Sequence, residues 1–224
     1  MSYNRYGVYY APPSGSPLAE FGDSWLGWDA EAGENVAHLD APVDVHAITT
    51  TPRKYGFHGT LKPPFRLTGD PAALFSALED LAASQAPFQT PPLRLSRIGP
   101  FLALTLSGPS SDLAKLAAAC VEALDPFRAQ PTEAELAKRR AAGLTDAQDA
   151  LLLRWGYPYV MEEFRFHLTL TGALDDTTAE AALDALTPLT EPHCQNPLDV
   201  RELTLFGEAE DGRFHIVRRF PLGR

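Results

Sequence analysis

The chain has 224 residues, 45% of them hydrophobic, so it can bury a substantial core as one large domain or two small lobes. Its formal charge of −10 at neutral pH disfavours long nucleic acids and acidic membranes as partners, because both are polyanions. The first residues lack the basic start and apolar run of an export signal, and no stretch approaches the roughly 20 apolar residues of a membrane span. Composition therefore predicts a soluble, cytoplasmic protein.

The cysteine content excludes a disulfide framework. Cys120 and Cys194 are the two cysteines of the sequence, and they lack the paired spacing of zinc ligands. Both are expected to be free thiols.

The first half of the chain predicts strands that alternate with helices. Residues 5–10 (RYGVYY) are rich in aromatic and β-branched side chains, and the APPSGSP that follows ends this strand. Gly99 and Pro100 separate two further apolar runs in a turn suited to an antiparallel hairpin. The elements expected in this half are strands at 5–10, 57–62, 93–98 and 101–106 and helices at 18–28 and 71–84.

The same order of elements returns in the second half, which indicates an internal duplication. When His58 is aligned with His167, Gly99 and Gly207 fall 41 and 40 residues downstream, and the last strands begin 43 and 46 residues after their histidines. The repeats are expected at 53–107 and 163–220, with strands at 164–172, 199–207 and 213–220 and a helix at 176–189 in the second.

The segment between the repeats, at about 111–155, predicts a helical insertion. Residues 111–127 are amphipathic with a helical period, and residues 132–155 have the pattern of a helical pair interrupted near Gly143. This pair has no counterpart in the repeat. The sequence leaves open whether it is a lid or a plain insertion.

Each repeat carries a Phe-His-x-Thr-Leu motif, at 57–61 and at 166–170. Successive side chains of a strand point to opposite faces, so each motif strand presents a polar row in front of an apolar backing. The expected rows are His58, Thr60 and Lys62 in the first strand and His167, Thr169 and Thr171 in the second.

A cationic window surrounds the first motif. Residues 51–66 include four basic residues and no acidic one, although the chain as a whole is acidic. A short basic run is often only a solvated surface. Its coincidence with a histidine motif favours an anion site instead, with Arg53 and Lys62 as its basic ligands.

The two motifs predict acid–base chemistry on a phosphoester. One imidazole would remove a proton from an attacking water, the other would protonate the departing alkoxide, and Thr60 and Thr169 would hydrogen-bond the non-bridging oxygens. Histidine suits both tasks because its ordinary pKa of about 6.5 populates both protonation states near neutrality. Since the duplicated strands are nearly equivalent, the sequence does not say which histidine is the acid. No set of metal-ligating carboxylates adjoins the motifs in the sequence, so neither a metal ion nor a cofactor is expected.

Tyrosines in and near the expected strands are candidates for contact with the organic part of a substrate. Tyr6, Tyr9, Tyr55 and Tyr159 are suited to this role, because a phenol ring stacks on a base or a ribose, and Tyr6 and Tyr55 are chosen among them. The alternative is that these rings belong to the core, as aromatic residues of strands often do.

These motifs resemble those of the two-histidine (2H) phosphoesterase superfamily, which includes cyclic phosphodiesterases with two His-x-Thr or His-x-Ser motifs in a pseudo-symmetric, two-lobed fold. The segments RYGVYYAPP, FGDSWLGWDAEAG, RKYGFHGTLKPPF, WGYPYV and FRFHLTLTG are similar to a bacterial, phosphonate-associated branch of unknown function. The resemblance implies His58 and His167 as the acid–base pair and Thr60 and Thr169 as phosphate ligands. The branch usually holds alanine at the position of Gly59.

We therefore expect a single α+β domain over residues 1–224, with two pseudo-symmetric lobes of antiparallel sheet and flanking helices around a central cleft. The expected function is metal-independent hydrolysis of a small cyclic phosphate of ribose or nucleotide type by a monomer. Two alternatives stay open: a non-catalytic module that binds a phosphosugar or nucleotide, and a 2H enzyme that processes RNA ends.

Overall fold

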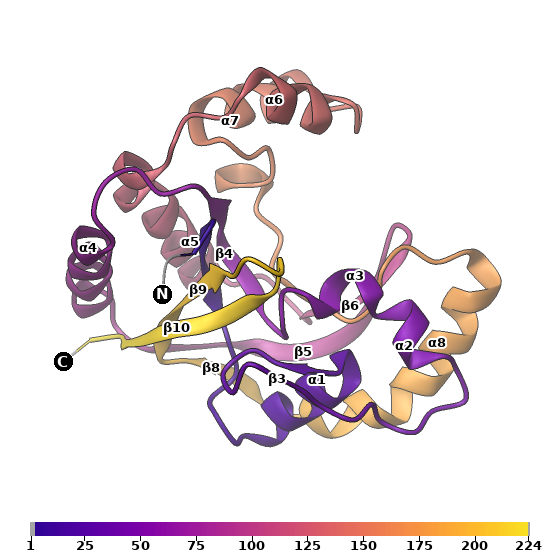
Figure 1. Cartoon of the computed structure of the whole chain (residues 1–224). Coiled ribbons are helices and arrows are strands. Elements are labelled where there is room, and N and C mark those ends of the chain that lie inside the picture. The colour runs from indigo at the N-terminus through magenta and orange to yellow at the C-terminus, as the bar shows by residue number, and fades with distance from the viewer. Residues whose placement is uncertain (1–2, 224) are drawn as a thin grey trace.

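The two histidine motifs lie on neighbouring strands near the middle of an eight-stranded antiparallel sheet. Figure 1 shows this sheet with helices around it. The computed structural model describes residues 3–223, and its helices flank the sheet, which confirms the predicted α+β class. The sheet has the order β10-β9-β1-β4-β7-β6-β5-β8. Its strands are β1 (Tyr6–Tyr10), β4 (Gly59–Phe65), β5 (Phe88–Ile98), β6 (Phe101–Leu106), β7 (His167–Thr169), β8 (Pro197–Val200), β9 (Glu202–Glu208) and β10 (Phe214–Pro221), and β2 (Trp28–Asp29) pairs separately with β3 (Glu34–Asn35).

Helices follow most of the predicted positions. Gly143 lies between the two helices of the predicted pair, and Ser16 caps the first helix by accepting a hydrogen bond from the amide of Ala19 at 3.2 Å. The α-helices are α1 (Pro17–Leu26), α2 (Val45–Ile48), α3 (Thr50–Arg53), α4 (Pro71–Ser84), α5 (Ser111–Ala123), α6 (Glu133–Arg140), α7 (Asp146–Trp155) and α8 (Asp176–Thr190). Short 3-10 turns cover Asp125–Phe127, Met161–Glu163 and Glu191–His193.

The two sequence repeats interleave in the sheet. The hairpin of β5 and β6 follows the first motif along the chain, yet it pairs with β7, which carries the second motif. The hairpin of β9 and β10 follows the second motif, yet it joins β4 through β1. Each half of the sheet therefore combines strands from both repeats, an exchange that the repeat spacing does not predict.

The sheet is curled because one residue links two strands from its opposite ends. The segment predicted as a single strand at 199–207 is divided at Arg201 into β8 and β9. β8 is the last strand at one end of the sheet, and β9 is next to last at the other. Since two residues of extended chain span at most about 7 Å, the two ends of the sheet must approach each other.

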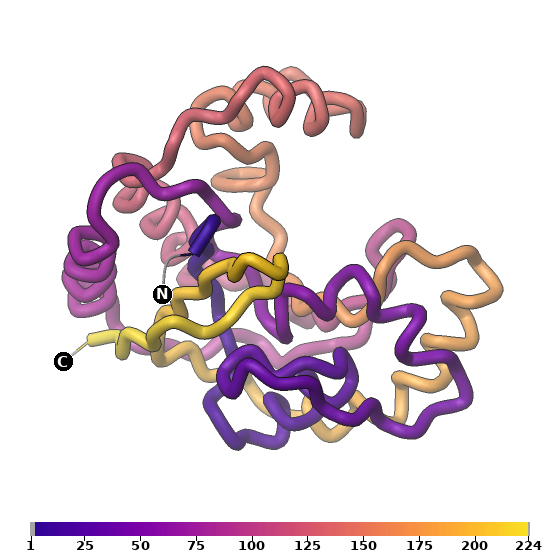
Figure 2. The backbone as a smooth tube through the Cα atoms, viewed as in Figure 1, coloured from indigo at the N-terminus to yellow at the C-terminus, as the bar shows by residue number. Residues whose placement is uncertain are grey.

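The main hydrophobic core lies between the sheet and the helices α4, α5 and α8. Leu61 and Leu168 come from the motif strands, and Leu78, Leu116 and Leu186 come from the three helices. In Figure 2 the segment of α6 and α7 stands apart from this core as an arm above the sheet. Within residues 3–223, the helices are too short or too polar to cross a lipid bilayer.

Gly59 allows close packing directly behind the first motif. A Cβ atom at this position would lie 2.3 Å from Cε2 of Phe166, whose ring packs edge-on against Tyr10 with ring centroids 5.8 Å apart. The alanine usual in the resembling branch would therefore require this ring to move.

We expect Gly59→Ala to lower the free energy of unfolding by about 1–3 kcal/mol, because it overpacks a filled site. Urea unfolding measures the loss, and the double variant Gly59→Ala with Phe166→Leu should recover part of it relative to Phe166→Leu alone. An equal cost of Gly59→Ala in both backgrounds would show that Phe166 is not the obstacle.

Candidate active site

The register of β4 and β7 brings four motif side chains onto one face. Gly59 pairs with Leu168, so the adjoining positions of the antiparallel strands place His58 opposite Thr169 and Thr60 opposite His167. Residues directly opposite each other share a face, and diagonal neighbours have Cβ atoms about 7–8 Å apart. The two histidines occupy such a diagonal, which leaves room between their rings for a tetrahedral phosphate.

The two imidazole rings are held in the same way. Nδ1 of His58 lies 2.9 Å from the carbonyl oxygen of Gly56, and Nδ1 of His167 lies 2.8 Å from that of Arg165. A carbonyl oxygen only accepts, so each Nδ1 carries the proton and donates it. In both rings Nε2 is therefore the nitrogen available for proton transfer. Gly56 makes the first contact possible because its φ of +71° turns the chain sharply before His58.

Aromatic rings enclose His58. The Tyr9 ring is stacked on the imidazole with centroids 4.0 Å apart, and the rings of Phe206 and Tyr55 follow at 6.0 and 6.1 Å. This loss of water lowers the pKa of His58 to about 4. The hydrogen bond to the Gly56 carbonyl raises the pKa by a smaller amount, and the charge of His167 lowers it slightly further. His58 is therefore neutral at pH 7 and can accept a proton.

A cleft of about 340 Å³ opens in front of the motif residues, a volume suited to a small ligand. Of the predicted site residues, His58, Thr60, Thr169 and Tyr55 line it. His167 is not among the residues that line the cleft, but it lies opposite the lining residue Thr60 and its ring is 5.7 Å from that of Phe101, another lining residue. The structure therefore brings both motifs to one site.

Lys62 does not reach this cleft. Tyr9 pairs with Thr60 but Val8 pairs with Lys62, so β4 gains one residue relative to β1 and forms a bulge. The bulge reverses the alternation and turns Lys62 to the helix-covered face, where it is 2% exposed. Its Nζ donates to the carbonyl of Val121 at 3.1 Å, and burial lowers its pKa to about 8.

Arg53 and Tyr6 are also placed away from the cleft. The Arg53 guanidinium donates to the Leu26 carbonyl at 2.8 Å and to the Thr49 hydroxyl at 2.8 Å, so it ties together the segments before the motif. Tyr6 is buried on the core side of β1, with its ring 5.8 Å from that of Tyr3. Both side chains make contacts within the protein, and neither lines the cleft as predicted.

Several other residues of the cleft, among them Arg5, Arg139 and Tyr157, were not predicted as site residues, and Tyr9, one of the tyrosines considered for ring stacking, lines it as well. Tyr9 lies on the cleft side of β1 and Tyr6 on the core side, as strand alternation requires, and the sequence carries this signal. Arg139 and Tyr157 come from the insertion and the segment after it, and no local pattern indicates that they reach the motifs. In the part of the chain that the structure describes, no cluster of three His, Cys, Asp or Glu side chains is arranged to hold a metal ion.

Sequence comparison identifies a family and two related proteins. The family model described as "Protein of unknown function (DUF1045)" matches residues 60–215. The chain is 42% identical, over 80% of its length and 41% of the relative's, to Ribose 1,5-bisphosphate phosphokinase PhnN of Janthinobacterium sp. (strain Marseille). It is 35% identical, over 93% of its length and 49% of the relative's, to the protein of the same name from Laribacter hongkongensis (strain HLHK9). The chain thus spans less than half the length of these curated relatives.

The crystal structure of E. coli LigT complexed with 3'-AMP matches the whole of both chains with 17% identity and a TM-score of 0.48. The family of unknown function and the relatives named PhnN confirm the predicted resemblance to the phosphonate-associated branch.

The buried Lys62 predicts a pH-dependent stability. Its folded-state pKa lies below the ordinary 10.5, so between pH 8 and 10.5 the unfolded chain binds more protons and the stability of the protein rises with pH. Lys62→Met should remove this rise, which is about 3 kcal/mol for a shift of this size. Denaturant unfolding from pH 7 to 10.5 measures it, with exposed Lys115→Met as the matched control. The same pH dependence in wild type and Lys62→Met would contradict the burial argument.

Proposed function

The chain belongs to the DUF1045 family, and from its paired histidine strands we propose that it is a phosphodiesterase that opens a small cyclic phosphate. The observation that carries the proposal is the array of two histidines and two threonines on adjacent strands at one cleft. Both histidines offer Nε2, and both threonines offer a hydroxyl donor to phosphate oxygens. Fixed donors of this kind stabilise the charge that develops on phosphorus oxygens in the transition state.

The surroundings of the two histidines differ, and we assign their roles on this basis. His58 is neutral at pH 7, so its Nε2 takes a proton from water while the water oxygen forms a bond to phosphorus. The bond from phosphorus to the opposite ring oxygen breaks, and protonated His167 gives its Nε2 proton to that alkoxide. The products are a phosphomonoester and a free hydroxyl on the same molecule.

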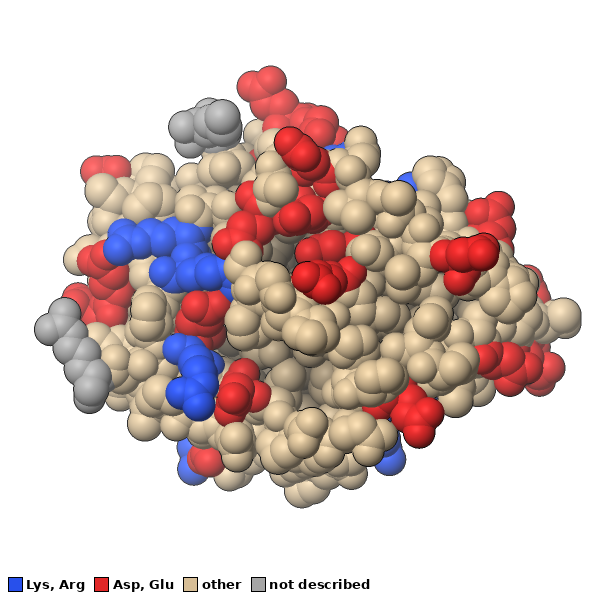
Figure 3. All heavy atoms as spheres, turned by 90° about the horizontal axis from the view of Figure 1, so that it is seen from below, with Lys and Arg blue, Asp and Glu red and all other residues tan. Residues whose placement is uncertain are grey.

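A small sugar phosphate suits the site better than RNA. The chain carries −10 formal charge, and acidic side chains are spread over the face shown in Figure 3, where most of the basic surface lies on the left-hand side. The cleft is a hollow of limited volume with Tyr55 and Tyr157 in its wall, which suits a sugar or nucleoside ring. The relatives named for ribose 1,5-bisphosphate support a ribose cyclic phosphate as the substrate class.

The phosphokinase activity in those names is not assigned to this chain. The relatives are more than twice as long as the segment that matches, so another part of them is free to carry that activity. The present sequence has no G-x-x-x-x-G-K-[ST] phosphate-binding loop. The motif geometry instead favours phosphoester hydrolysis.

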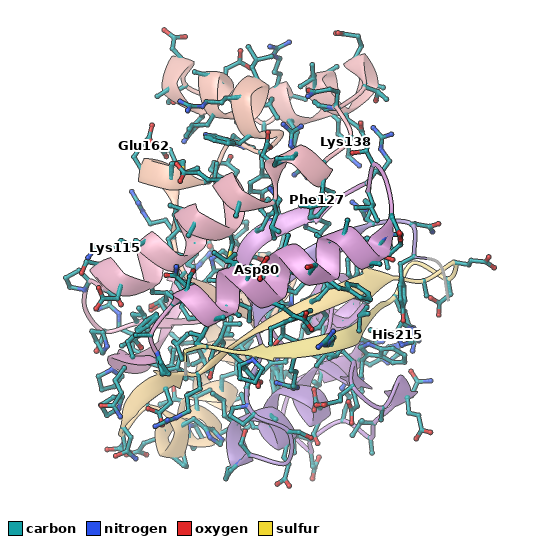
Figure 4. All side chains as sticks on the ribbon, turned by 90° about the vertical axis from the view of Figure 1, so that its left-hand side faces the viewer. Asp80, Lys115, Phe127, Lys138, Glu162 and His215 are labelled. Atoms are coloured by element: carbon teal, nitrogen blue, oxygen red, sulfur yellow. The ribbon has the colours of Figure 1, made fainter. Side chains whose placement is uncertain are left out.

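Replacing either catalytic histidine should nearly abolish turnover. We expect His58→Ala and His167→Ala each to lower kcat on a ribose cyclic phosphate by about 10²- to 10⁴-fold, the usual contribution of general acid–base catalysis. His215→Ala is the matched control, because His215 lies on β10 and packs against the Trp28 ring with centroids 5.3 Å apart (Figure 4). Binding without turnover by the wild-type protein would favour the non-catalytic module, and preference for RNA ends would favour the RNA-processing alternative.

The pH profile should show the low pKa of His58. A base with a pKa of about 4 stays neutral as the pH falls from 7 to 5, so the acid limb of kcat/KM should lie near pH 4 instead of near 6.5. Tyr9→Ala admits water to the imidazole and should move this limb toward 6.5, whereas Tyr9→Phe keeps the stacked ring and should leave it in place. An acid limb at 6.5 in the wild-type enzyme would rule out this assignment of the base.

A further inference from the structure

A second hollow, of about 400 Å³, adjoins the active-site cleft. The two share Arg5, Tyr55, Pro64 and Arg139 as lining residues, so they lie side by side. Six cationic side chains line this second hollow, which we call the basic pocket: Arg5, Lys54, Arg66, Arg128, Lys138 and Arg139. Among the described residues that line it, Glu135 is the one acidic residue.

The basic pocket keeps an excess of positive charge after its ion pairs are counted. Three of the six cations are paired: Arg5 with Glu208 at 2.6 Å, Arg66 with Glu135 at 3.1 Å and Arg128 with Asp125 at 2.8 Å. Within residues 3–223, the other three, Lys54, Lys138 and Arg139, have no carboxylate at ion-pair distance. An excess of three positive charges in a chain of net charge −10 focuses the local field on an anion.

Two of these cations stand beside the wall of the catalytic cleft. Nζ of Lys54 lies 4.8 Å from the Tyr55 ring centroid, and the Arg139 guanidinium lies 4.7 Å from that of Tyr157. Both of these tyrosine rings also line the cleft in front of His58. A group that extends from a substrate in the cleft therefore meets these cations first.

Arg128 gives independent evidence that the basic pocket binds a group with a hydrogen-bond acceptor. Its side chain is 6% exposed, and its buried Nη1 has no hydrogen-bond partner, although Nε and Nη2 are satisfied by Asp125 and the Arg154 carbonyl. A buried guanidinium donor without an acceptor is uncommon in folded proteins. Arg128 lines the same pocket as the unpaired cations, and a phosphate oxygen is the acceptor that suits a guanidinium best.

We propose that the basic pocket binds a second phosphate of the substrate, so that the enzyme acts on a sugar cyclic phosphate that also bears a terminal phosphomonoester. This inference rests on the proposed function and narrows its substrate class. The cyclic diester carries one negative charge, whereas a phosphomonoester carries nearly two at pH 7, which matches the charge excess of the pocket. The inference also gives the insertion a role, because α6 supplies Lys138 and Arg139 and the repeats have no counterpart of this helix.

The test compares a ribose cyclic phosphate that has a free 5-hydroxyl with its 5-phosphorylated counterpart. The wild-type enzyme should prefer the phosphorylated substrate in kcat/KM by at least about tenfold, mainly through KM, as expected for one or two charge-assisted hydrogen bonds. The triple variant Lys54→Gln, Lys138→Gln and Arg139→Gln should reduce this ratio to within about twofold of one. Lys115→Gln is the matched control and should keep the ratio, because Lys115 lies on α5, well away from Lys138 (Figure 4).

The outcomes separate this inference from the proposed function. Equal turnover of both substrates by the wild-type enzyme, or a ratio that the triple variant leaves unchanged, overturns the second-phosphate site and leaves the phosphodiesterase intact. If neither substrate is turned over, the proposed function fails. Calorimetry with ribose 5-phosphate then shows whether the basic pocket binds a phosphomonoester. Binding that Lys115→Gln keeps and the triple variant loses then supports the site, and the absence of binding to the wild-type protein overturns it.

Discussion

The pairing of β4 with β7 is the constraint on which the rest of the site depends. It sets Gly59 against Leu168, and this single register decides that both histidines and both threonines emerge on the same face. A shift by one residue would turn one motif toward the helices. Apolar residues behind each motif, such as Leu61 and Leu168, hold the register because they are buried in the main core. The chemistry is thus fixed by the same backbone pairing that closes the hydrophobic core.

The site is symmetric in its backbone and asymmetric in its surroundings. Both histidines donate Nδ1–H to the carbonyl two residues earlier, as expected for duplicated strands. The neighbours differ, however, because the Tyr9 ring is stacked on His58, whereas the ring near His167 is that of Phe101, in a tilted arrangement. Burial then lowers the pKa of His58, and the different roles proposed for the two histidines rest on this asymmetry of their surroundings. The insertion adds a second asymmetry, since it contributes basic residues to one side of the cleft.

The sequence indicates the position of those site residues that follow from strand alternation and repeat spacing. It does not indicate the position of residues that depend on contacts between distant segments. Strand alternation and the repeat register correctly place Thr60 and Thr169 on a shared cleft. Alternation fails for Lys62 because the bulge in β4 is set by pairing with β1, and the Pro63-Pro64 pair directly after Lys62 is the sequence signal of this irregularity, since proline inside a strand is typical of bulges. The exchange of hairpins between the repeats and the approach of Arg139 to the cleft both depend on contacts between distant segments. These features follow from packing, which a single sequence does not display.

The most direct test of the central claim is phosphorus NMR of a ribose cyclic phosphate incubated with the protein in ¹⁸O-labelled water. Attack by a water activated at His58, with His167 protonating one fixed leaving oxygen, predicts a new monoester resonance from a single positional isomer with one ¹⁸O bound to phosphorus. The His58→Ala and His167→Ala proteins should leave the cyclic resonance nearly unchanged over the time in which the wild-type protein converts it. A cyclic phosphate that binds the wild-type protein and persists without any new resonance would contradict the account.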